Sequence, residues 1–440
     1  MKEDKNNFKD NNNNSNNNRG GGANAAQSGP VFYDIHCHAM NLSHPCMLAF
    51  VNRCVRALRE ITLKELMRSI NSLTKIKIIK ELFEMAGSYK EAKNLLAVME
   101  NDSGGVFLLM EDCLCGKYGF KPPLLESETG LKIGGTTYRK AVLTPLIMDF
   151  GGGGAGAKSG TYYNSPARKP VTEQIIDLFN GVNKYAARSE LSFFDIYPFL
   201  GINTRNFTLE KLESVLRQYF DGFSPAPASL SGASGKFDGE VKKLGVNSFA
   251  GIKVYPPLGF DPWPEDEPME LEKVEMLYGV CQAGRVPITA HCNDEGYATC
   301  TAADAAKYTE PARWEKVLKR YPRLKINLAH FGRKSDAPFS EWSNKICSLM
   351  YKYEFVYTDL SFNGFDPAYY AGLKTFLNKL PGKMAGIIPQ RIMFGSDFMM
   401  SLLKIESYSQ YLSYYSETPY LSAEAKYSFC SVNSERFLFD

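Results

Sequence analysis

The chain has 440 residues, of which 44% are hydrophobic and 13% aromatic, and its formal net charge at pH 7 is +3. A chain of this length can bury the core of one large barrel, or of roughly two or three smaller domains. The small net charge gives no reason to expect nucleic acid or an anionic membrane as the main partner, and no apolar run approaches the roughly 20 residues that span a bilayer. We expect a small-molecule partner and keep a homodimer as one option for the assembly.

Ten cysteines are scattered without paired spacing, and several of them, such as Cys281 and Cys347, lie inside apolar runs. This pattern favours free thiols in a reducing cytoplasm over a disulfide framework, and the N-terminus lacks the apolar core of a secretory signal. Residues 1–29 are mainly Asn and Gly, and so few apolar residues cannot offset the entropy lost on ordering. We expect a disordered tail followed by one domain over residues 30–440.

The first strand is predicted at residues 31–36, and it ends in His36-Cys37-His38. Residues i and i+2 of a strand point to the same side, so His36 and His38 can present both rings to one point, as metal chelation requires. The pattern is loose, because two histidines on a half-solvated strand face would look the same. However, the chain has only five histidines, and His291 and His330 also end short apolar runs.

An insertion is expected at residues 41–139, between the first strand and the next. Apolar residues recur there at helical spacing, which predicts helices at 46–60, 63–73, 76–85 and 88–99. These helices would form a cap over the mouth of the first strand. His44 lies at the start of the insertion, and a loop histidine lining the entrance is favoured over a fifth metal ligand.

From residue 140 onward, predicted strands alternate with predicted helices. The strands are expected at 141–150, 194–203, 249–255, 286–291, 324–330, 355–360 and 391–397, and the helices at 172–187, 209–219, 269–283, 311–320, 339–353, 367–379 and 423–435. Together with the first strand, this gives eight strands rich in Val, Ile, Leu and Phe, a pattern typical of strands that are buried on both faces and paired in parallel. Eight such units favour a closed (β/α)₈ TIM barrel over a doubly wound open sheet.

In a closed barrel, the carboxyl ends of the strands converge on the face where such barrels carry their active sites. The residues that end the predicted strands would then be neighbours, and they include His36, His38, Lys253, His291, His330 and Asp397. Imidazoles together with a carboxylate suit zinc, with manganese or iron as lesser candidates. Each residue alone has an ordinary explanation, such as a satisfied core histidine or a helix cap. Their shared position at strand ends indicates a site.

This ordered set resembles the amidohydrolase superfamily of metal-dependent barrel hydrolases. Three pieces are similar in particular to its amidohydrolase-2 branch: Gly251-Ile252-Lys253-Val254-Tyr255-Pro256-Pro257, Thr289-Ala290-His291-Cys292-Asn293 and Asn433-Ser434-Glu435-Arg436-Phe437-Leu438. The resemblance covers roughly residues 32–438 apart from the insertion. It implies that His36, His38 and His291 bind the metal. It also implies that Asp397 is a further ligand, or a close neighbour that accepts the proton of the attacking water.

The resemblance leaves two versions of the site open. His330 would bind a second metal or direct a ring nitrogen at the substrate. Lys253 would bridge two ions if it is carbamylated, and otherwise its ammonium would attract an anionic group of the substrate. The implied cofactor is therefore one divalent ion, zinc being the first candidate, or two ions if Lys253 carries a carbamate.

The resemblance implies an enzyme that hydrolyses an amide, ester or lactone carbonyl of a small organic substrate. Metal-dependent decarboxylation or hydration on the same barrel is the alternative. Decarboxylases of this branch often have Glu in place of the first histidine, whereas His36 is intact here. A non-catalytic binding or scaffold barrel is a distant alternative, which the complete ligand set disfavours.

Other polar and aromatic residues at the strand ends are candidates for substrate binding, namely Arg205, Asn293, Arg333 and Tyr255, with Asp149, Asn203 and Asp359 as weaker ones. Either arginine would hold a carboxylate in bidentate fashion, but an ordinary salt bridge explains each equally well. The glycine-rich stretch 151–159 follows a strand as a phosphate-binding loop would. It has Ala157 where that pattern needs Gly, so we interpret it as a mobile loop at the barrel mouth.

Overall fold

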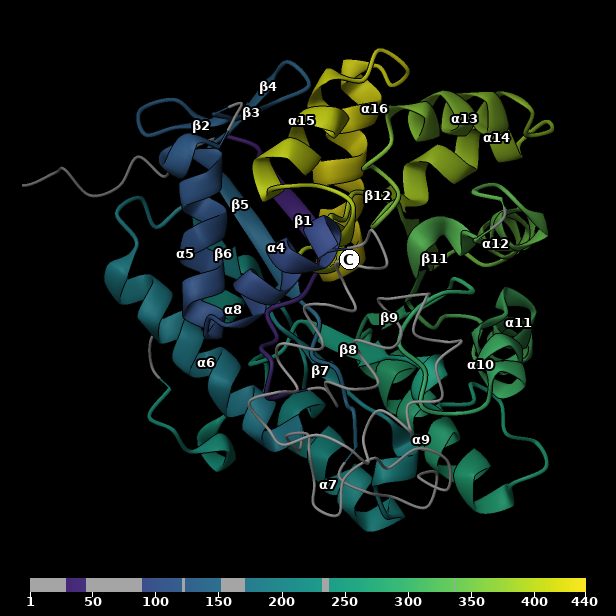
Figure 1. Cartoon of the computed structure of the whole chain (residues 1–440). Helices are drawn as coiled ribbons and strands as arrows, with labels where there is room; N and C mark the ends of the chain where they lie inside the picture. Colours follow the sequence, from purple (N-terminus) through teal and green to yellow (C-terminus); the bar gives the residue numbers. More distant parts are fainter. Residues whose placement is uncertain (1–28, 45–88, 121–122, 152–170, 232–236, 336) are drawn as a thin grey trace, which may run out of the picture.

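The structure is a computed structural model, and it describes residues 29–44, 89–120, 123–151, 171–231, 237–335 and 337–440 (Figure 1). Some predictions lie outside these residues. They are the disorder expected for the tail, the helices expected at 46–60, 63–73 and 76–85, and nearly all of the glycine-rich loop.

Nine short strands of the described chain occupy eight positions in the middle of the molecule, and helices surround them as an outer ring (Figure 1). The strands are β1 Val31–Cys37, β5 Lys140–Pro145, β6 Phe194–Ile196 with β7 Phe199–Gly201, β8 Gly251–Val254, β9 Ile288–Ala290, β10 Ile326–Leu328, β11 Val356–Asp359 and β12 Ile392–Met393. Almost every residue of these strands is buried. The continuous apolar runs of the sequence therefore correspond to strands covered on both faces.

The strands close into a ring. β1 pairs with β5 and β5 with β6, while β7 to β12 pair in chain order, and every one of these pairs is parallel. The two sheets meet at the bridge from Leu146 to Phe199, and the loop after β12 returns to β1 at the bridge from Cys37 to Phe398. The backbone N–H of Ile35 also donates to the carbonyl of Phe394 at 3.2 Å. The predicted (β/α)₈ barrel is confirmed.

A helix follows each strand position. The helices are α4 Tyr89–Met99 and α5 Ser103–Leu114 after β1, α6 Val171–Arg188 after β5, α7 Leu209–Phe220 and α8 Pro227–Ser231 after β7, α9 Pro268–Gly284 after β8, α10 Ala302–Thr309 and α11 Pro311–Arg320 after β9, α12 Glu341–Lys352 after β10, α13 Pro367–Asn378 and α14 Met384–Ile387 after β11, and α15 Tyr408–Glu417, α16 Ala423–Tyr427 and α17 Asn433–Phe439 after β12. The predicted helices that fall within the described residues agree with these elements. The sequence reasoning missed α5, α10 and α15, and the short helices α8 and α14.

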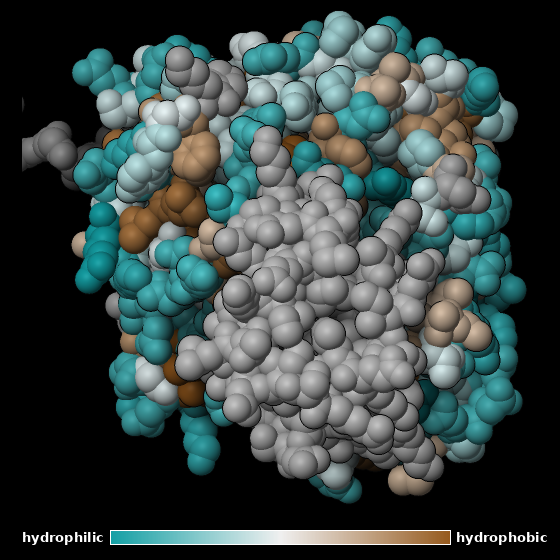
Figure 2. Space-filling view, viewed as in Figure 1, coloured by the Kyte–Doolittle hydropathy of each residue, from teal (hydrophilic) through white to brown (hydrophobic). Residues whose placement is uncertain are grey.

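The helix positions follow from amphipathic spacing and from caps. In α6, Ile175, Leu178, Phe179 and Val182 are buried at the i, i+3, i+4 and i+7 spacing of one helix face. The surface over α6 in Figure 2 is mostly hydrophilic, as the opposite face of such a helix should be. At the start of α13, the side chain of Asp366 accepts a hydrogen bond from the N–H of Ala368 at 2.8 Å, which satisfies one of the free donors of the first turn.

The insertion contains a small sheet as well as helices, and the sequence reasoning did not predict this sheet. Residues 125–138 form a small antiparallel sheet of β2 Leu125–Glu126, β3 Gly130–Ile133 and β4 Thr136–Tyr138. Gly134 and Gly135 join the last two strands with φ values of 58° and 87°, the left-handed conformation that a two-residue hairpin turn needs. The Gly-Gly pair is the sequence signal that the helical interpretation overlooked.

The described part of the chain has two further properties that bear on the predictions. Its eight cysteines are free thiols, six of them buried. None of its helices combines the length and the apolar character that crossing a membrane requires.

Candidate metal centre

The six side chains predicted to form the site lie together at the carboxyl ends of the strands. All are at most 6% exposed, and they come from the ends of five strands: His36, His38, Lys253, His291, His330 and Asp397. Their assignment as ligands and catalytic groups stays a prediction, whereas their convergence is a feature of the structure.

The histidines at the end of β1 face the aspartate that follows β12. The Nε2 atoms of His36 and His38 lie 3.6 Å and 3.2 Å from Oδ1 of Asp397. One nitrogen from each ring and one oxygen of Asp397 lie within 4.8 Å of one another. This spacing is suited to three ligands of a single ion.

The outer nitrogens of His36 and His38 are bound to acceptors outside this group. Nδ1 of His36 lies 3.0 Å from Oδ2 of Asp359, and Nδ1 of His38 lies 3.0 Å from the carbonyl oxygen of Leu146. Because a carbonyl or an ionised carboxylate only accepts, each Nδ1 carries the proton and donates. The lone pair of each ring is therefore on Nε2, which faces Asp397.

His291 and His330 also donate a ring N–H to an acceptor outside the cluster, in both cases a backbone carbonyl. Nε2 of His291 donates to the carbonyl of Glu295 at 2.9 Å, and Nδ1 of His330 donates to the carbonyl of Ser361 at 3.2 Å. The unprotonated nitrogens, Nδ1 of His291 and Nε2 of His330, then face each other at 3.1 Å. Two lone pairs at this separation repel each other unless a cation binds both. Two nitrogens bound to one tetrahedral zinc ion at about 2.0–2.1 Å would lie about 3.3 Å apart, close to this separation.

Burial keeps these rings neutral, which is the form that binds metal. It lowers the pKa of His36 to about 3, with Lys253 acting in the same direction and Asp359 against it. Burial is also the main cause that lowers the pKa of His291 and of His330. A neutral imidazole offers a lone pair, whereas an imidazolium does not.

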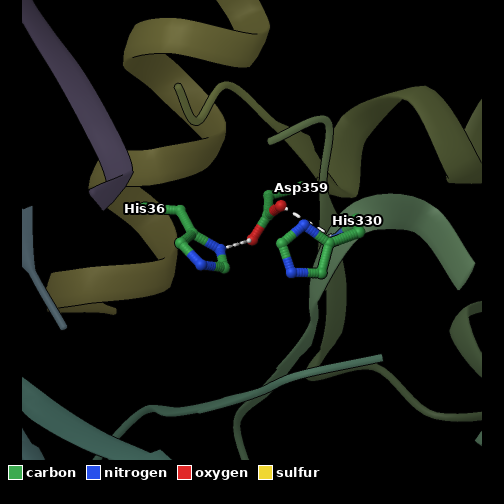
Figure 3. Close-up of side chains that lie close together, drawn as sticks. All are labelled: His36, His330 and Asp359. Carbon is green, nitrogen blue, oxygen red and sulfur yellow. Dashed lines mark hydrogen bonds and ion pairs between the residues drawn. The ribbon is translucent and has the colours of Figure 1, made fainter. Parts of the chain in front are cut away.

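Asp359 ends β11 and lies between the rings of His36 and His330 (Figure 3). Its Oδ1 accepts from the backbone N–H of His330 at 3.0 Å, and its Oδ2 accepts from Nδ1 of His36. Burial acts to raise the pKa of Asp359, but His36 and the hydroxyl of Ser361 outweigh it and hold this pKa well below its ordinary value. The sequence reasoning ranked Asp359 among the weak candidates for substrate contact.

Lys253 is the buried cation of the site. Its Nζ has no hydrogen-bond partner within the described residues, and it lies 5.6 Å from the centre of the Tyr255 ring. Burial lowers its pKa to about 8, while Asp397 and Asp359 act to raise it. A buried polar group without a partner costs free energy, so this amine favours a further group that the described residues do not supply.

Residues 215–439 match the family model described as Amidohydrolase, which is just over half of the 440 residues. The chain belongs to the amidohydrolase family. The matched region contains Lys253, His291, His330 and Asp397, whereas the two histidines of β1 precede it. No match is found among curated proteins.

Solved structures also resemble this amidohydrolase. A TIM-barrel protein of Bordetella bronchiseptica is 12% identical with a TM-score of 0.44, and the match covers 93% of this chain and 98% of that one. The 5-carboxyvanillate decarboxylase of Novosphingobium aromaticivorans, solved with manganese, is 12% identical with a TM-score of 0.42 and coverage of 93% and 95%. A probable 2-pyrone-4,6-dicarboxylic acid hydrolase of Acinetobacter baumannii is 12% identical with a TM-score of 0.40 and coverage of 69% and 84%.

Two of the predicted substrate-binding residues hold the loop of His291 in this amidohydrolase. The ring centre of Tyr255 lies 4.3 Å from that of His291, and the phenol oxygen of Tyr255 accepts from the N–H of Tyr297 at 3.1 Å. Oδ1 of Asn293 accepts from the N–H of Glu295 at 3.0 Å, in the turn that brings the carbonyl of Glu295 to His291. Both residues touch the site, and their contact with a substrate stays a prediction.

The two arginines predicted to bind substrate have different contacts in the structure. The two terminal nitrogens of Arg205 donate to Glu267 at 2.8 Å and 2.7 Å, so Arg205 forms the ordinary salt bridge that the sequence left open. The guanidinium carbon of Arg333 lies 5.6 Å and 5.5 Å from the ring centres of Phe362 and Phe365. Nη1 of Arg333 is buried without a hydrogen-bond partner within the described residues.

Three weaker candidates have structural contacts. Asp149 accepts from the N–H of Asn203 at 2.9 Å and from that of Gly151 at 3.1 Å, which ties the loops after β5 and β7 together. Nε2 of His44 lies 2.9 Å from Oδ2 of Asp177 in α6. This contact places His44 against the helix ring.

Backbone strain marks the site of the amidohydrolase. His330, Phe331 and Asp397 have φ values of 62°, 51° and 53°, in the left-handed region that residues other than glycine seldom adopt. Such conformations persist at functional sites, where the surrounding structure enforces them. The sequence gives no signal of this strain, because all three positions carry ordinary L-residues.

We expect Gly395→Ala to lower metal affinity by displacing His36. An added Cβ would lie 2.8 Å from Cβ of His36 and 3.0 Å from Cβ of Ser361. Relieving this overlap should cost about 1–3 kcal/mol of unfolding free energy. The measurements are thermal unfolding and metal content after dialysis. Gly386→Ala is the control, because its Cβ would meet nothing within 4 Å. Unchanged metal affinity in Gly395→Ala would show that His36 tolerates the shift.

Proposed function

We propose that this amidohydrolase is a metal-dependent hydrolase that acts on an amide, ester or lactone carbonyl of a small organic substrate. The observation that carries the proposal is the orientation of its four buried histidines. Each ring donates its N–H to an acceptor outside the cluster. The second ring nitrogen of each histidine therefore keeps its lone pair and faces the inside of the cluster, where Asp397 also lies. Such a set of ligand atoms fits a divalent cation.

We assign His36, His38 and His291 as ligands, with Asp397 as a further ligand or close neighbour, and zinc as the first candidate. The contact between His291 and His330 supports His330 as a second partner of the ion or as the ligand of another ion. A bound divalent ion supplies a Lewis acid that polarises a carbonyl oxygen and lowers the pKa of water. Zinc is favoured because imidazole nitrogen and carboxylate oxygen are among its usual ligands.

Asp397 is the general base in this proposal. Its Oδ1 lies within 3.6 Å of both β1 histidines, so a water near these rings would also lie near the carboxylate. An ionised carboxylate at hydrogen-bond range can take the proton of that water as it attacks the carbonyl, and can later return the proton to the leaving group.

Lys253 has one of two roles in this proposal. Its buried Nζ, which has no hydrogen-bond partner among the described residues, can hold an anionic group of the substrate. Alternatively, it can react with carbon dioxide and lose a proton to form a carbamate, which would bridge two ions. The lowered pKa of about 8 leaves a fraction of the amine unprotonated near neutral pH, and only the unprotonated amine reacts with carbon dioxide.

The protein as purified should contain about one or two equivalents of a divalent metal, and it should lose activity when a chelator removes the metal. Elemental analysis gives the metal count. A panel of lactones, aryl esters and anilides is then assayed for acid release in weakly buffered dye solution, with zinc or manganese added back to the chelated protein. A chain that binds no divalent metal under any of these conditions would contradict the proposal.

The same assay separates the two reactions open to this fold. Aromatic carboxylic acids are included in the panel, and carbon dioxide is measured alongside acid release. Hydrolysis of lactones or esters without release of carbon dioxide supports the proposal. Release of carbon dioxide from the acids, with the lactones and esters unchanged, would assign the decarboxylase alternative instead.

A further inference from the structure

We propose that Asp359 is a positioning residue that fixes the ring tautomers of both His36 and His330, directly for one ring and through Ser361 for the other. This inference rests on the proposed metal centre, because the tautomers decide which nitrogens can bind a metal. It adds a role for a residue that is not itself a ligand. The arrangement is shown in Figure 3, where the carboxylate of Asp359 lies between the two rings.

Asp359 is surrounded entirely by donors. Its Oδ1 accepts from the backbone N–H groups of His330 and Ser361, both at 3.0 Å, and from the hydroxyl of Ser361. Its Oδ2 accepts from Nδ1 of His36 at 3.0 Å and from Nδ2 of Asn327 at 2.7 Å. A carboxylate has about four lone-pair sites, and these five donors occupy them. Although Asp359 lies close enough to His36 and His330 to share an ion with them, it has no free lone pair for one.

The bond to Asp359 sets the tautomer of His36. The carboxylate can only accept, so the proton of His36 is on Nδ1 and the lone pair is on Nε2, the nitrogen that faces Asp397. This is the carboxylate–histidine arrangement that orients metal ligands in many proteins. The opposite tautomer would place an N–H where the proposed metal binds.

Ser361 extends the same control to His330. Its hydroxyl has one hydrogen, which it donates to Oδ1 of Asp359. The hydroxyl oxygen can then only accept at Nδ1 of His330, which lies 2.9 Å away, and the carbonyl of Ser361 accepts from the same nitrogen. Nδ1 of His330 therefore carries the proton, and Nε2 keeps its lone pair towards His291.

An amide cannot replace the carboxylate without changing His36. In Asp359→Asn, the side-chain NH₂ cannot occupy the Oδ1 position, because the two backbone N–H groups there cannot reverse. It must therefore occupy the Oδ2 position. Asn327 can adapt by turning its amide, since its Oδ1 is buried without a partner within the described residues. Nδ1 of His36 then faces an amide N–H, although the hydroxyl oxygen of Ser361 also lies 3.0 Å from it. Moving the proton of His36 from Nδ1 to Nε2 lets Nδ1 accept from that amide.

The test is the tautomer of His36 in metal-free protein. The full chain is labelled with ¹⁵N-histidine, and two-bond ¹H–¹⁵N correlation spectra distinguish Nδ1–H from Nε2–H rings. The His36 signal is assigned by its absence in His36→Gln. We expect Nδ1–H in the unsubstituted chain and Nε2–H in Asp359→Asn. Zinc affinity, measured by competition with a chelating dye, should fall about 10- to 100-fold in the variant, the range for loss of an outer partner.

Glu111→Gln is the matched control. Glu111 is also a buried carboxylate surrounded by donors, which are the hydroxyls of Tyr185 and Ser189 and the N–H of Phe193. No histidine ring nitrogen is among these donors. This variant should lose thermal stability but keep the His36 tautomer and the zinc affinity.

Either of two results would overturn the inference: an Nε2–H ring at His36 in the unsubstituted chain, or, where that chain binds zinc, an equal zinc affinity in Asp359→Asn. The first result is measured on the unsubstituted chain, so it does not depend on whether a variant folds. If the unsubstituted chain has the Nδ1–H ring, and the ring changes in Asp359→Asn, but neither protein binds zinc, the proposed metal centre fails and the positioning role stands.

Discussion

The chain with both His36→Ala and His38→Ala should lose its metal and fall in turnover by about a thousandfold or more. The reason is that a catalytic ion contributes several kcal/mol to transition-state stabilisation, and each 1.36 kcal/mol is a factor of about ten in rate. The two rings supply the lone pairs that face Asp397. Metal content by elemental analysis and turnover on a hydrolysed substrate measure the two effects.

The fold should survive this double substitution. Residues at the carboxyl face of a barrel serve function more than stability, so the thermal unfolding of the chelated variant should stay close to that of the chelated parent chain. His44→Ala is the control, because His44 contacts Asp177 and lies outside the cluster. Retention of metal by the double variant would refute the ligand assignment. Loss of folding would show instead that the ion is structural.

Asp397→Asn should keep most of its metal and lose turnover by about 10²- to 10⁴-fold, the usual contribution of a positioned general base. Asparagine can still offer a carbonyl oxygen near His36 and His38, but it cannot accept a proton from water. The measurements are kcat at saturating metal and bound metal at the same concentration. A rate equal to that of the parent chain would refute the role of Asp397 as the base.

Asp294→Asn provides the comparison for that variant. Asp294 also lies in a loop at the barrel mouth, and it accepts from the N–H and the hydroxyl of Ser335 at 2.8 Å and 3.0 Å. It has no hydrogen bond to a histidine of the cluster in the described structure, so its substitution should leave metal content unchanged. If Asp397→Asn loses the metal altogether, Asp397 acts chiefly as a ligand.

The barrel and the convergence of its strand ends could be predicted from the sequence. Eight apolar runs alternate with amphipathic stretches, and this pattern together with the closure of parallel sheets is enough to bring His36 and Asp397 together. Local periodicity was less informative in the insertion. There the Gly134-Gly135 turn produces a hairpin that the search for helical spacing did not predict.

The finer geometry of the site could not be predicted, because it depends on contacts between distant segments. His330 adopts a left-handed conformation, and Asp359, 29 positions further on, accepts from its backbone N–H. The pairing of Arg205 with Glu267 joins residues that are 62 positions apart. Sequence patterns give the type of each side chain, but they do not give the distant group with which it forms a salt bridge or hydrogen bond. For this reason the sequence analysis ranked Asp359 too low among the candidates.

The seam between β1 and β12 has a consequence for when the proposed metal centre can form. Across it, Asp34 accepts hydrogen bonds from the backbone and hydroxyl of Ser396, residues 362 positions apart. His36 and His38 leave the ribosome well before Asp397, which lies far later in the chain. A nascent polypeptide thus lacks the complete coordination pocket that we propose until β12 and the loop after it are in place. Loading of the proposed centre with metal would therefore follow the synthesis and insertion of β12.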